Sequence, residues 1–148
     1  MPRSTQYSFH KHPDADARLR SAHNLVHLLH SSKDLTIEHK REFLKLALWK
    51  VTEAEANNKH RTRYCSESAF ANPSEKLRHD HVFQRAIMVD RLLSASVKEI
   101  PAILAEAVGC TITEEEHRSL NAFKHLDGWE RYERAGIRTR DCGRVAHI

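Results

Sequence analysis

Residues 37–54, with the sequence IEHKREFLKLALWKVTEA, carry the clearest structural pattern in the chain. Apolar residues recur there every three or four positions, which is the spacing of one face of an α-helix. Thr36 or Asp34 can cap this helix, because both side chains accept hydrogen bonds from free backbone N–H groups of a first turn. The expected buried face consists of Ile37, Phe43, Leu44, Ala47, Leu48, Val51 and Ala54.

A second amphipathic pattern lies immediately upstream, in residues 13–31. Pro13 suits the first turn of a helix because its φ angle is already helical. Only a short link separates this helix from the next one, and a short link predicts that the two helices form an antiparallel hairpin. The expected inward residues of the upstream helix are Leu19, Ala22, Leu25, Val26 and Leu29.

The rest of the chain continues the helical pattern. Helices are expected over 77–94, after Pro101, after the capping box Thr113–Glu116 and after Asp127, with Gly109 and Gly136 as stops. Residues 59–66, 110–112 and 137–141 could supply short strands. The predicted fold is mainly α: one compact domain of five or six helices that begins with the hairpin, to which a two- or three-stranded β element could be added.

Composition limits the class of protein. The chain has 148 residues, 24 Lys and Arg against 20 Asp and Glu, and 12 His. One domain over residues 13–141 is expected, with flexible tails at 1–12 and 142–148. No apolar run is long enough for a membrane span, so no membrane partner is expected. The three cysteines are odd in number and far apart in the sequence, which predicts reduced thiols in a cytoplasmic protein.

The first candidate site is His79-Asp80-His81, with Arg85 four residues further on. In an extended segment His79 and His81 point the same way, which suits a metal ion or two contacts to one phosphate. His81 is also expected to begin the helix that carries Arg85. A histidine that activates water beside an arginine that neutralises a phosphate is ordinary phosphodiester chemistry. The alternative is a surface pair at a helix start, with Asp80 as the counter-charge.

Two further segments carry candidate ligands. In an extended Lys59–Tyr64 segment, Lys59, Arg61 and Arg63 share one face that fits a phosphate backbone, and Tyr64 could stack on a base. The alternative is a solvated edge strand. His117 is the candidate third metal ligand beside His79 and His81, for zinc or manganese. It is expected on one helix face with Asn121 and His125, although the capping box alone explains the start of that helix.

Asp80-His81-Val82 resembles the first motif of the HNH nucleases. The resemblance implies a histidine at a strand–helix junction that activates water beside a metal ion, with Asn121 and His125 in the places of the later Asn and His. The sequence departs from that family in two respects. No cysteine knuckles flank the motif, and a predicted helix separates parts that the family keeps in one compact ββα unit.

Two classes of function follow from these patterns. The first is a nucleic-acid-directed protein, on DNA or RNA, acting as a metal-dependent phosphodiesterase. No glycine-rich phosphate loop is present, so no nucleotide cofactor is expected.

The second class of function is a non-catalytic protein-interaction module of the inhibitor, immunity or adaptor type that uses the exposed face of the helical hairpin. Leu46 and Trp49 support it because they fall outside the apolar face, and they could also mark a homodimer interface.

Overall fold

The computed structural model describes residues 6–143. Helices dominate, and they are combined with a four-stranded mixed sheet that is larger than the sequence predicts. The helices are α1 Ala15–Ser31, α2 Ile37–Glu53, α3 Glu67–Ala71, α4 Arg85–Ser94, α5 Ile100–Ala105, α6 Glu114–Ser119 and α7 Gly128–Arg134, with 3-10 turns at Val97–Glu99 and Leu120–Phe123. The strands are β1 Tyr64–Ser66, β2 Leu77–His81, β3 Gly109–Thr113 and β4 Thr139–Asp141. None of the helices within residues 6–143 is long and apolar enough to cross a bilayer.

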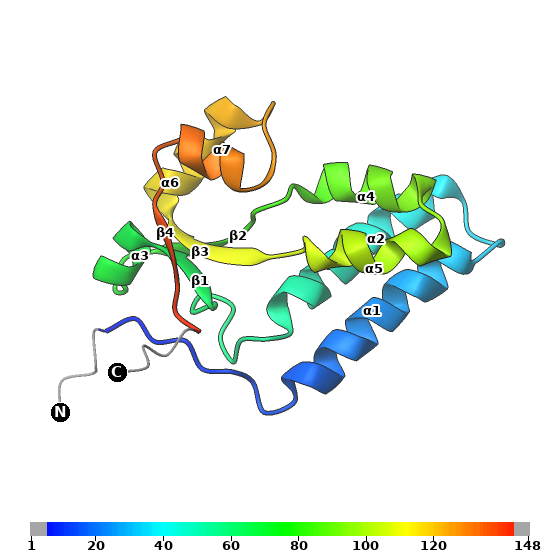
Figure 1. Ribbon diagram of the computed structural model, residues 1–148, viewed down its shortest axis with the longest axis horizontal. Helices are drawn as coiled ribbons and strands as arrows, with labels where there is room; N and C mark the ends of the chain where they lie inside the picture. The colour runs from blue at the N-terminus through cyan, green and yellow to red at the C-terminus, as the bar shows by residue number, and fades with distance from the viewer. Residues whose placement is uncertain (1–5, 144–148) are drawn as a thin grey trace.

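Helices α1 and α2 pack side by side and run in opposite directions (Figure 1). Near one end of the pair Arg18 donates a hydrogen bond to the Glu53 carbonyl, and near the other Lys40 donates to the His30 carbonyl. Thr36 caps α2, as one of the two predicted caps, by accepting from the His39 N–H at 3.2 Å. Two residues of the expected apolar face, Ile37 and Phe43, are 65% and 46% exposed. The others are buried, namely Leu44, Ala47, Leu48, Val51 and Ala54.

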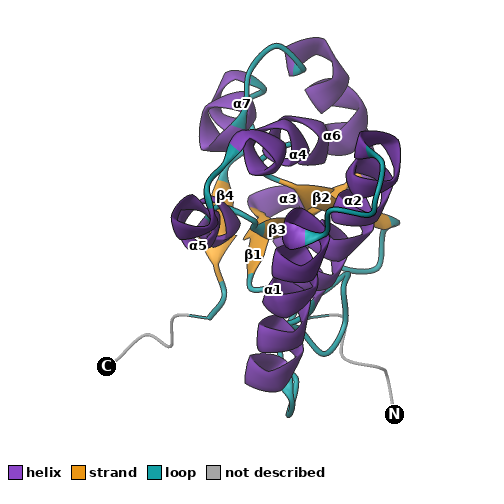
Figure 2. Ribbon diagram, turned by 90° about the vertical axis from the view of Figure 1, so that its right-hand side faces the viewer, coloured by secondary structure: helices purple, strands orange, loops and turns teal. Residues whose placement is uncertain are grey.

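The sheet has the strand order β2-β3-β1-β4 and lies at one end of the molecule, where α3, α6 and α7 surround it (Figures 1 and 2). β2 pairs antiparallel with β3 over five residues, from Leu77 opposite Thr113 to His81 opposite Gly109. β1 pairs parallel with β3 and antiparallel with β4. Helices α4 and α5 lie between β2 and β3 in the sequence, and they leave the sheet to pack on α1 and α2 (Figure 1).

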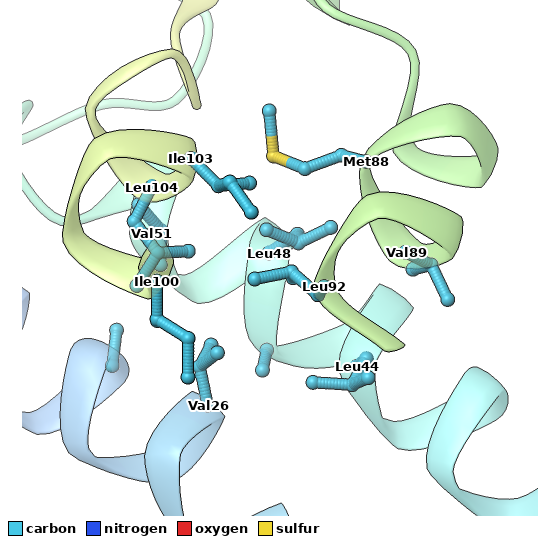
Figure 3. Packing of buried hydrophobic residues seen from close by; sticks show 12 residues of the cluster. Val26, Leu44, Leu48, Val51, Met88, Val89, Leu92, Ile100, Ile103 and Leu104 are labelled. Atoms are coloured by element: carbon cyan, nitrogen blue, oxygen red, sulfur yellow. The ribbon is translucent and has the colours of Figure 1, made fainter. Parts of the chain in front are cut away.

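Three clusters of buried apolar residues hold these elements together. The largest lies among α1, α2, α4 and α5 (Figure 3) and contains Val26, Leu44, Leu48, Val51, Val89, Leu92, Ile100 and Leu104. A second cluster joins the sheet to α7 through Ile112 and Tyr132. The third is small and contains Tyr7, Cys65, Ala69 and Leu77. The helical half and the sheet half therefore have separate cores within one structure.

The predicted helix over residues 77–94 is wrong in its first part. Leu77–His81 is strand β2, and α4 begins only at Arg85. β3 supplies hydrogen-bonding partners along all of β2, and the helical spacing of later residues such as Val89 and Leu92 concealed this long-range pairing.

Both predicted tails lie only partly within the described residues, because residues 1–5 and 144–148 fall outside them. Residues 7–12 pack on the domain instead of extending from it. Tyr7 is buried, its hydroxyl donates to the Thr62 carbonyl at 2.6 Å, and Lys11 forms a bridge with Ala56. At the other end, the Cys142 N–H donates to the Arg63 carbonyl.

The helical core predicts a clear difference between two leucines of α2. Leu48 is fully buried, whereas Leu46 is 50% exposed on the same helix. We expect Leu48→Ala to lower the free energy of unfolding by about 3 kcal/mol, because it removes buried methyl groups and leaves a cavity. The matched control, Leu46→Ala, should cost less than about 0.5 kcal/mol. Urea denaturation of both variants measures the difference, and equal losses would contradict this packing.

Candidate functional site

Strand β2 presents His79 and His81 on one face and Asp80 on the other. The two imidazoles face α2, where the Trp49 ring lies against both of them. The Trp49 centroid is 4.5 Å from that of His81 and 5.1 Å from that of His79, and the two imidazole centroids are 5.6 Å apart. The two histidines therefore lie on one side of an extended segment, as the site hypothesis assumed and the predicted helix over 77–94 did not. The sequence did not indicate Trp49 as the residue against which they pack.

Hydrogen bonds fix the orientation of His79. Its Nδ1 lies 2.8 Å from the Lys59 carbonyl and must be the donor, because a carbonyl oxygen only accepts. In a neutral imidazole the Nε2 then carries the lone pair, and this atom is 3.2 Å from the Thr52 hydroxyl. The same hydroxyl is 3.4 Å from Nε2 of His81. Both histidines thus direct Nε2 toward one point on α2.

The close packing of His79 depends on a glycine in the neighbouring strand. A Cβ at Gly109 would lie 2.6 Å from both Cε1 and Nε2 of the His79 ring, which is too close for any side chain. Glycine at this position of β3 lets the ring lie over the strand backbone.

The surroundings of the histidines keep both uncharged. Burial is the main reason that the pKa of His81 is lowered to about 3, and electrostatic repulsion from His79, Arg85 and Arg131 contributes to the same shift. Burial also lowers the pKa of His79, and its hydrogen bond to Lys59 offsets this only in part. Near neutral pH both rings are therefore neutral and can offer a lone pair to a proton or a metal ion.

Beside the histidines lies an open cleft of about 310 Å³, lined by Lys45, Trp49, His79, Asp80, His81, Gln84, Arg85, Ala86, His117 and Arg131. The Arg85 guanidinium lies over the Trp49 ring, 4.9 Å from its centroid, and burial lowers its pKa. Within residues 6–143, neither Arg85 nor Lys45 forms an ion pair with a carboxylate. The cleft therefore combines two neutral imidazoles with two cations whose charges no carboxylate balances.

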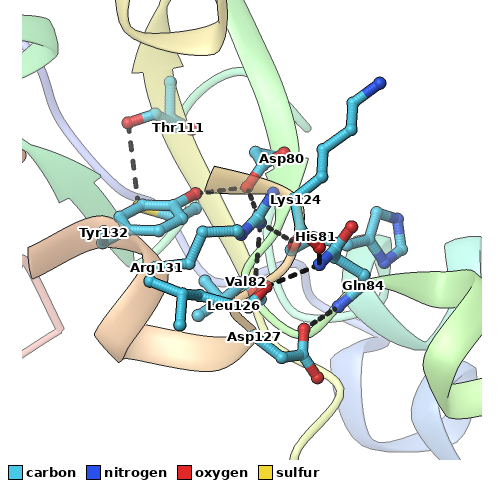
Figure 4. Close-up of polar contacts among 11 residues, drawn as sticks. Asp80, His81, Val82, Gln84, Thr111, Lys124, Leu126, Asp127, Arg131 and Tyr132 are labelled. Carbon is cyan, nitrogen blue, oxygen red and sulfur yellow. Dashed lines mark hydrogen bonds and ion pairs between the residues drawn. The ribbon is translucent and has the colours of Figure 1, made fainter. Parts of the chain in front are cut away.

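Asp80 occupies the opposite face of β2, where α7 neutralises it (Figure 4). Arg131 Nη2 is 2.8 Å from Asp80 Oδ2, and the same nitrogen donates to the carbonyls of His81 and Val82 at 2.7 and 3.1 Å. The Tyr132 hydroxyl donates to Asp80 Oδ2 at 2.5 Å. Burial raises the pKa of Tyr132, so this hydroxyl keeps its proton. Asp80 is thus a structural anchor bound by two groups of α7.

The short link from β2 to α4 is fixed in the same region (Figure 4). The Gln84 N–H donates to Asp127 Oδ1 at 2.7 Å, and the Gln84 side chain donates to the carbonyls of Leu126 and Lys124. These contacts hold the start of α4, and with it Arg85, beside the histidines. Nothing in the local sequence around Arg131 indicates its contact with Asp80, which is 51 positions away.

No residue of the basic segment Lys59–Tyr64, which was predicted to bind nucleic acid, lines this cleft. Arg63 forms a two-bond ion pair with Asp141 at 2.8 and 2.9 Å, and this raises the pKa of Arg63. Arg61 donates to the carbonyls of His60 and Pro73. Tyr64 packs edge-on against Trp129. Lys59 binds His79 through its backbone carbonyl. Three of these four side chains are therefore engaged in contacts within the protein.

The three histidines predicted as metal ligands, His79, His81 and His117, all line the cleft. The expected helix that carries His117, Asn121 and His125 on one face is wrong, because α6 ends at Ser119 and a 3-10 turn follows. Asn121 and His125 are exposed outside the cleft. Among the residues that the structure describes, no three His, Cys, Asp or Glu side chains come close enough together to hold a metal ion.

Strands β2 and β3 and helix α6 form two antiparallel strands followed by a helix. α6 contacts both strands and begins at the predicted capping box, in which Thr113 and Glu116 bond each other's backbone N–H groups. Helices α4 and α5 lie between the two strands in the sequence, so β2, β3 and α6 are not the compact, contiguous ββα unit of the HNH family. This agrees with the departure from that family noted from the sequence.

No protein-family model matches this chain, and neither a curated protein nor a solved structure is significantly similar to it.

The buried, uncharged His81 predicts a dependence of stability on pH. An unfolded histidine binds a proton below about pH 6.5, whereas folded His81 binds one only near pH 3. The unfolded state therefore binds more protons between these values, so stability is full above pH 6.5 and falls as the pH falls toward 3. We expect this histidine to cost on the order of 3 kcal/mol at pH 4 relative to pH 7.

Urea denaturation of wild type and His81→Gln at several pH values measures this effect. The variant should lose less stability on acidification. The control is His39→Gln, at an exposed position of α2, which should follow the wild-type curve. Parallel curves for wild type and His81→Gln would contradict a buried neutral His81.

Proposed function

We propose that this protein binds the phosphodiester backbone of a nucleic acid in the cleft beside His79 and His81 and hydrolyses it there. The observation that carries the proposal is the presence, in one cleft, of two uncharged imidazoles and two cations that no carboxylate of residues 6–143 neutralises. An anionic ligand would satisfy Lys45 and Arg85, since the carboxylate of Asp80 is already bound by Arg131.

The cleft offers distinct roles to its groups. Arg85 presents a planar, multidentate donor to phosphate oxygens, and its position over Trp49 restrains the guanidinium. Lys45 adds a mobile charge from the neighbouring helix. Because nearby negative charge favours the protonated form of an imidazole, a bound phosphate raises the pKa of His81 toward the range of an effective base.

In the proposed reaction, His81 accepts a proton from a water molecule while the water oxygen forms a bond to phosphorus. The ester bond to the leaving oxygen breaks on the opposite side of phosphorus, where a water molecule protonates that oxygen, and the imidazolium returns its proton to solvent. Arg85 and Lys45 stabilise the extra negative charge on the phosphate oxygens during the transfer.

A zinc or manganese ion fits this site only in part. His79 and His81 direct Nε2 toward a common point, but the Thr52 hydroxyl lies at that point, and the described residues provide no third ligand there. When bound, such an ion would polarise the phosphate. The roles given above to His81, Arg85 and Lys45 do not depend on it.

Binding is tested with labelled single-stranded DNA, double-stranded DNA and RNA by fluorescence anisotropy over a range of salt concentrations. We expect Lys45→Ala and Arg85→Ala each to weaken binding roughly fivefold and to reduce the salt slope by about one. The matched control is Lys50→Ala, an exposed lysine of α2 outside the cleft. Wild-type affinity in both cleft variants would refute the proposed phosphate site, and the preferred nucleic acid identifies the substrate.

Hydrolysis is tested with the best-bound nucleic acid, in the presence of zinc, manganese or a chelator. We expect His81→Ala to reduce cleavage at least about a hundredfold while binding is retained. Elemental analysis of wild type and His81→Ala shows whether a metal ion copurifies and depends on His81. Binding without cleavage under every condition would leave a nucleic-acid-binding protein and exclude the hydrolytic step.

The second candidate is a protein-interaction module on the outer face of α2. Trp49 no longer supports it, because its ring packs within the protein against His79 and His81. Phe43 and Leu46 do support it, since they are neighbours on α2 and are 46% and 50% exposed. The same surface could join two copies of the chain. Sedimentation velocity of wild type and Leu46→Glu distinguishes a dimer, which the variant would dissociate, from a monomer.

A further inference from the structure

Two cysteines that are far apart in the sequence meet at the edge of the sheet. Cys65 lies in β1 opposite Arg140 of β4, and Cys142 follows β4, where its N–H donates to the Arg63 carbonyl. Side chains alternate along paired strands, so Cys65 and Cys142 lie on the same face in diagonal positions. Their sulfur atoms are 3.4 Å apart, and both cysteines are free thiols.

The two thiols differ in their access to solvent. Cys65 is fully buried in the small cluster with Tyr7, Ala69 and Leu77, and burial raises the pKa of its thiol. Cys142 packs against this cluster but is only half-buried. An oxidant in solution therefore reaches Cys142 first, and Cys65 is the nearest group that can react with the product.

We propose that Cys65 and Cys142 form an oxidisable thiol pair, which a hydroperoxide converts into an intramolecular disulfide that fastens β4 to β1. The Cys142 thiolate attacks one oxygen of the peroxide, the O–O bond breaks, and Cys142 becomes a sulfenic acid while one water or alcohol is released. The Cys65 sulfur then bonds to the Cys142 sulfur. The S–O bond breaks, and the hydroxyl leaves as water with the Cys65 proton.

Little movement is needed for this reaction. The sulfur atoms must approach by about 1.4 Å from their 3.4 Å separation to reach a disulfide bond length. β4 is a short edge strand that pairs with β1 through three residues, so it can adjust. Cys110 cannot compete with either cysteine, because it points to the other face of the sheet and packs with Ile112 and Tyr132.

The disulfide would close a large loop of the chain. The two cysteines are 77 positions apart, and the loop includes β2, β3 and the cleft histidines. A cross-link over such a loop stabilises a protein chiefly by restricting its unfolded state. Oxidation is therefore expected to strengthen attachment of the C-terminal strand without altering the cleft.

The test uses the full chain, treated with hydrogen peroxide, followed by thiol alkylation and peptide mass mapping. In wild type we expect a peptide that links Cys65 to Cys142, one remaining alkylatable thiol at Cys110, and a melting temperature about 10 °C higher that dithiothreitol reverses. Cys110→Ala is the matched control and should form the same link. Cys142→Ser, a change at a half-buried position, should fold, form no intramolecular link and show no thermal shift.

Three results would overturn the proposal. They are sulfinic or sulfonic acid at Cys142 without any linked peptide, a disulfide that joins two chains, and a linked peptide with no change in melting temperature. None of these measurements depends on nucleic acid, so they test the thiol pair separately from the phosphodiesterase proposal.

Discussion

The arrangement of the site depends on one buried ion pair, between Asp80 on β2 and Arg131 on α7, whose side chains are only 12% and 7% exposed. Arg131 also binds the carbonyls of His81 and Val82, so it fixes the end of the strand as well as the carboxylate. Because neighbouring strand residues point to opposite faces, holding Asp80 toward α7 directs His79 and His81 toward α2. A shift of β2 by one residue would separate Asp80 from Arg131 and leave a buried charge without its partner, which is costly.

The insertion of α4 and α5 between β2 and β3 explains how a small sheet comes to lie beside a helical core. The inserted helices contribute Val89, Leu92 and Ile100 to the cluster shared with α1 and α2. They thereby bring α2 close to the face of β2 that carries the histidines. Trp49 and Thr52 extend from α2 into this contact, and Gly109 gives the His79 ring room over β3.

Local signals in the sequence predicted the parts of the fold that local interactions stabilise. The Thr36 cap and the Thr113–Glu116 capping box are examples, because donor and acceptor lie within one helical turn. Strand β2 was missed because only its distant partner β3 makes it a strand. The predicted His79, His81, Arg85 and His117 do line one cleft, whereas Lys45 and Arg131 were missed. The positions of these two residues depend on how α2 and α7 pack against the sheet. No short sequence pattern predicts that packing.

The strand order also has a consequence for the order of folding during synthesis. β1 lies between β3 and β4, both of which follow it far along the chain, so it has no sheet partner when it is made. The helical pair α1 and α2 can form early from nearby residues, but the sheet cannot close until residue 141 is available. Until then the edge of β1 that faces β4 remains unpaired and able to bind other chains, even after β3 has paired with its other edge. A nascent chain interrupted before β4 would therefore be more prone to aggregate than the finished protein.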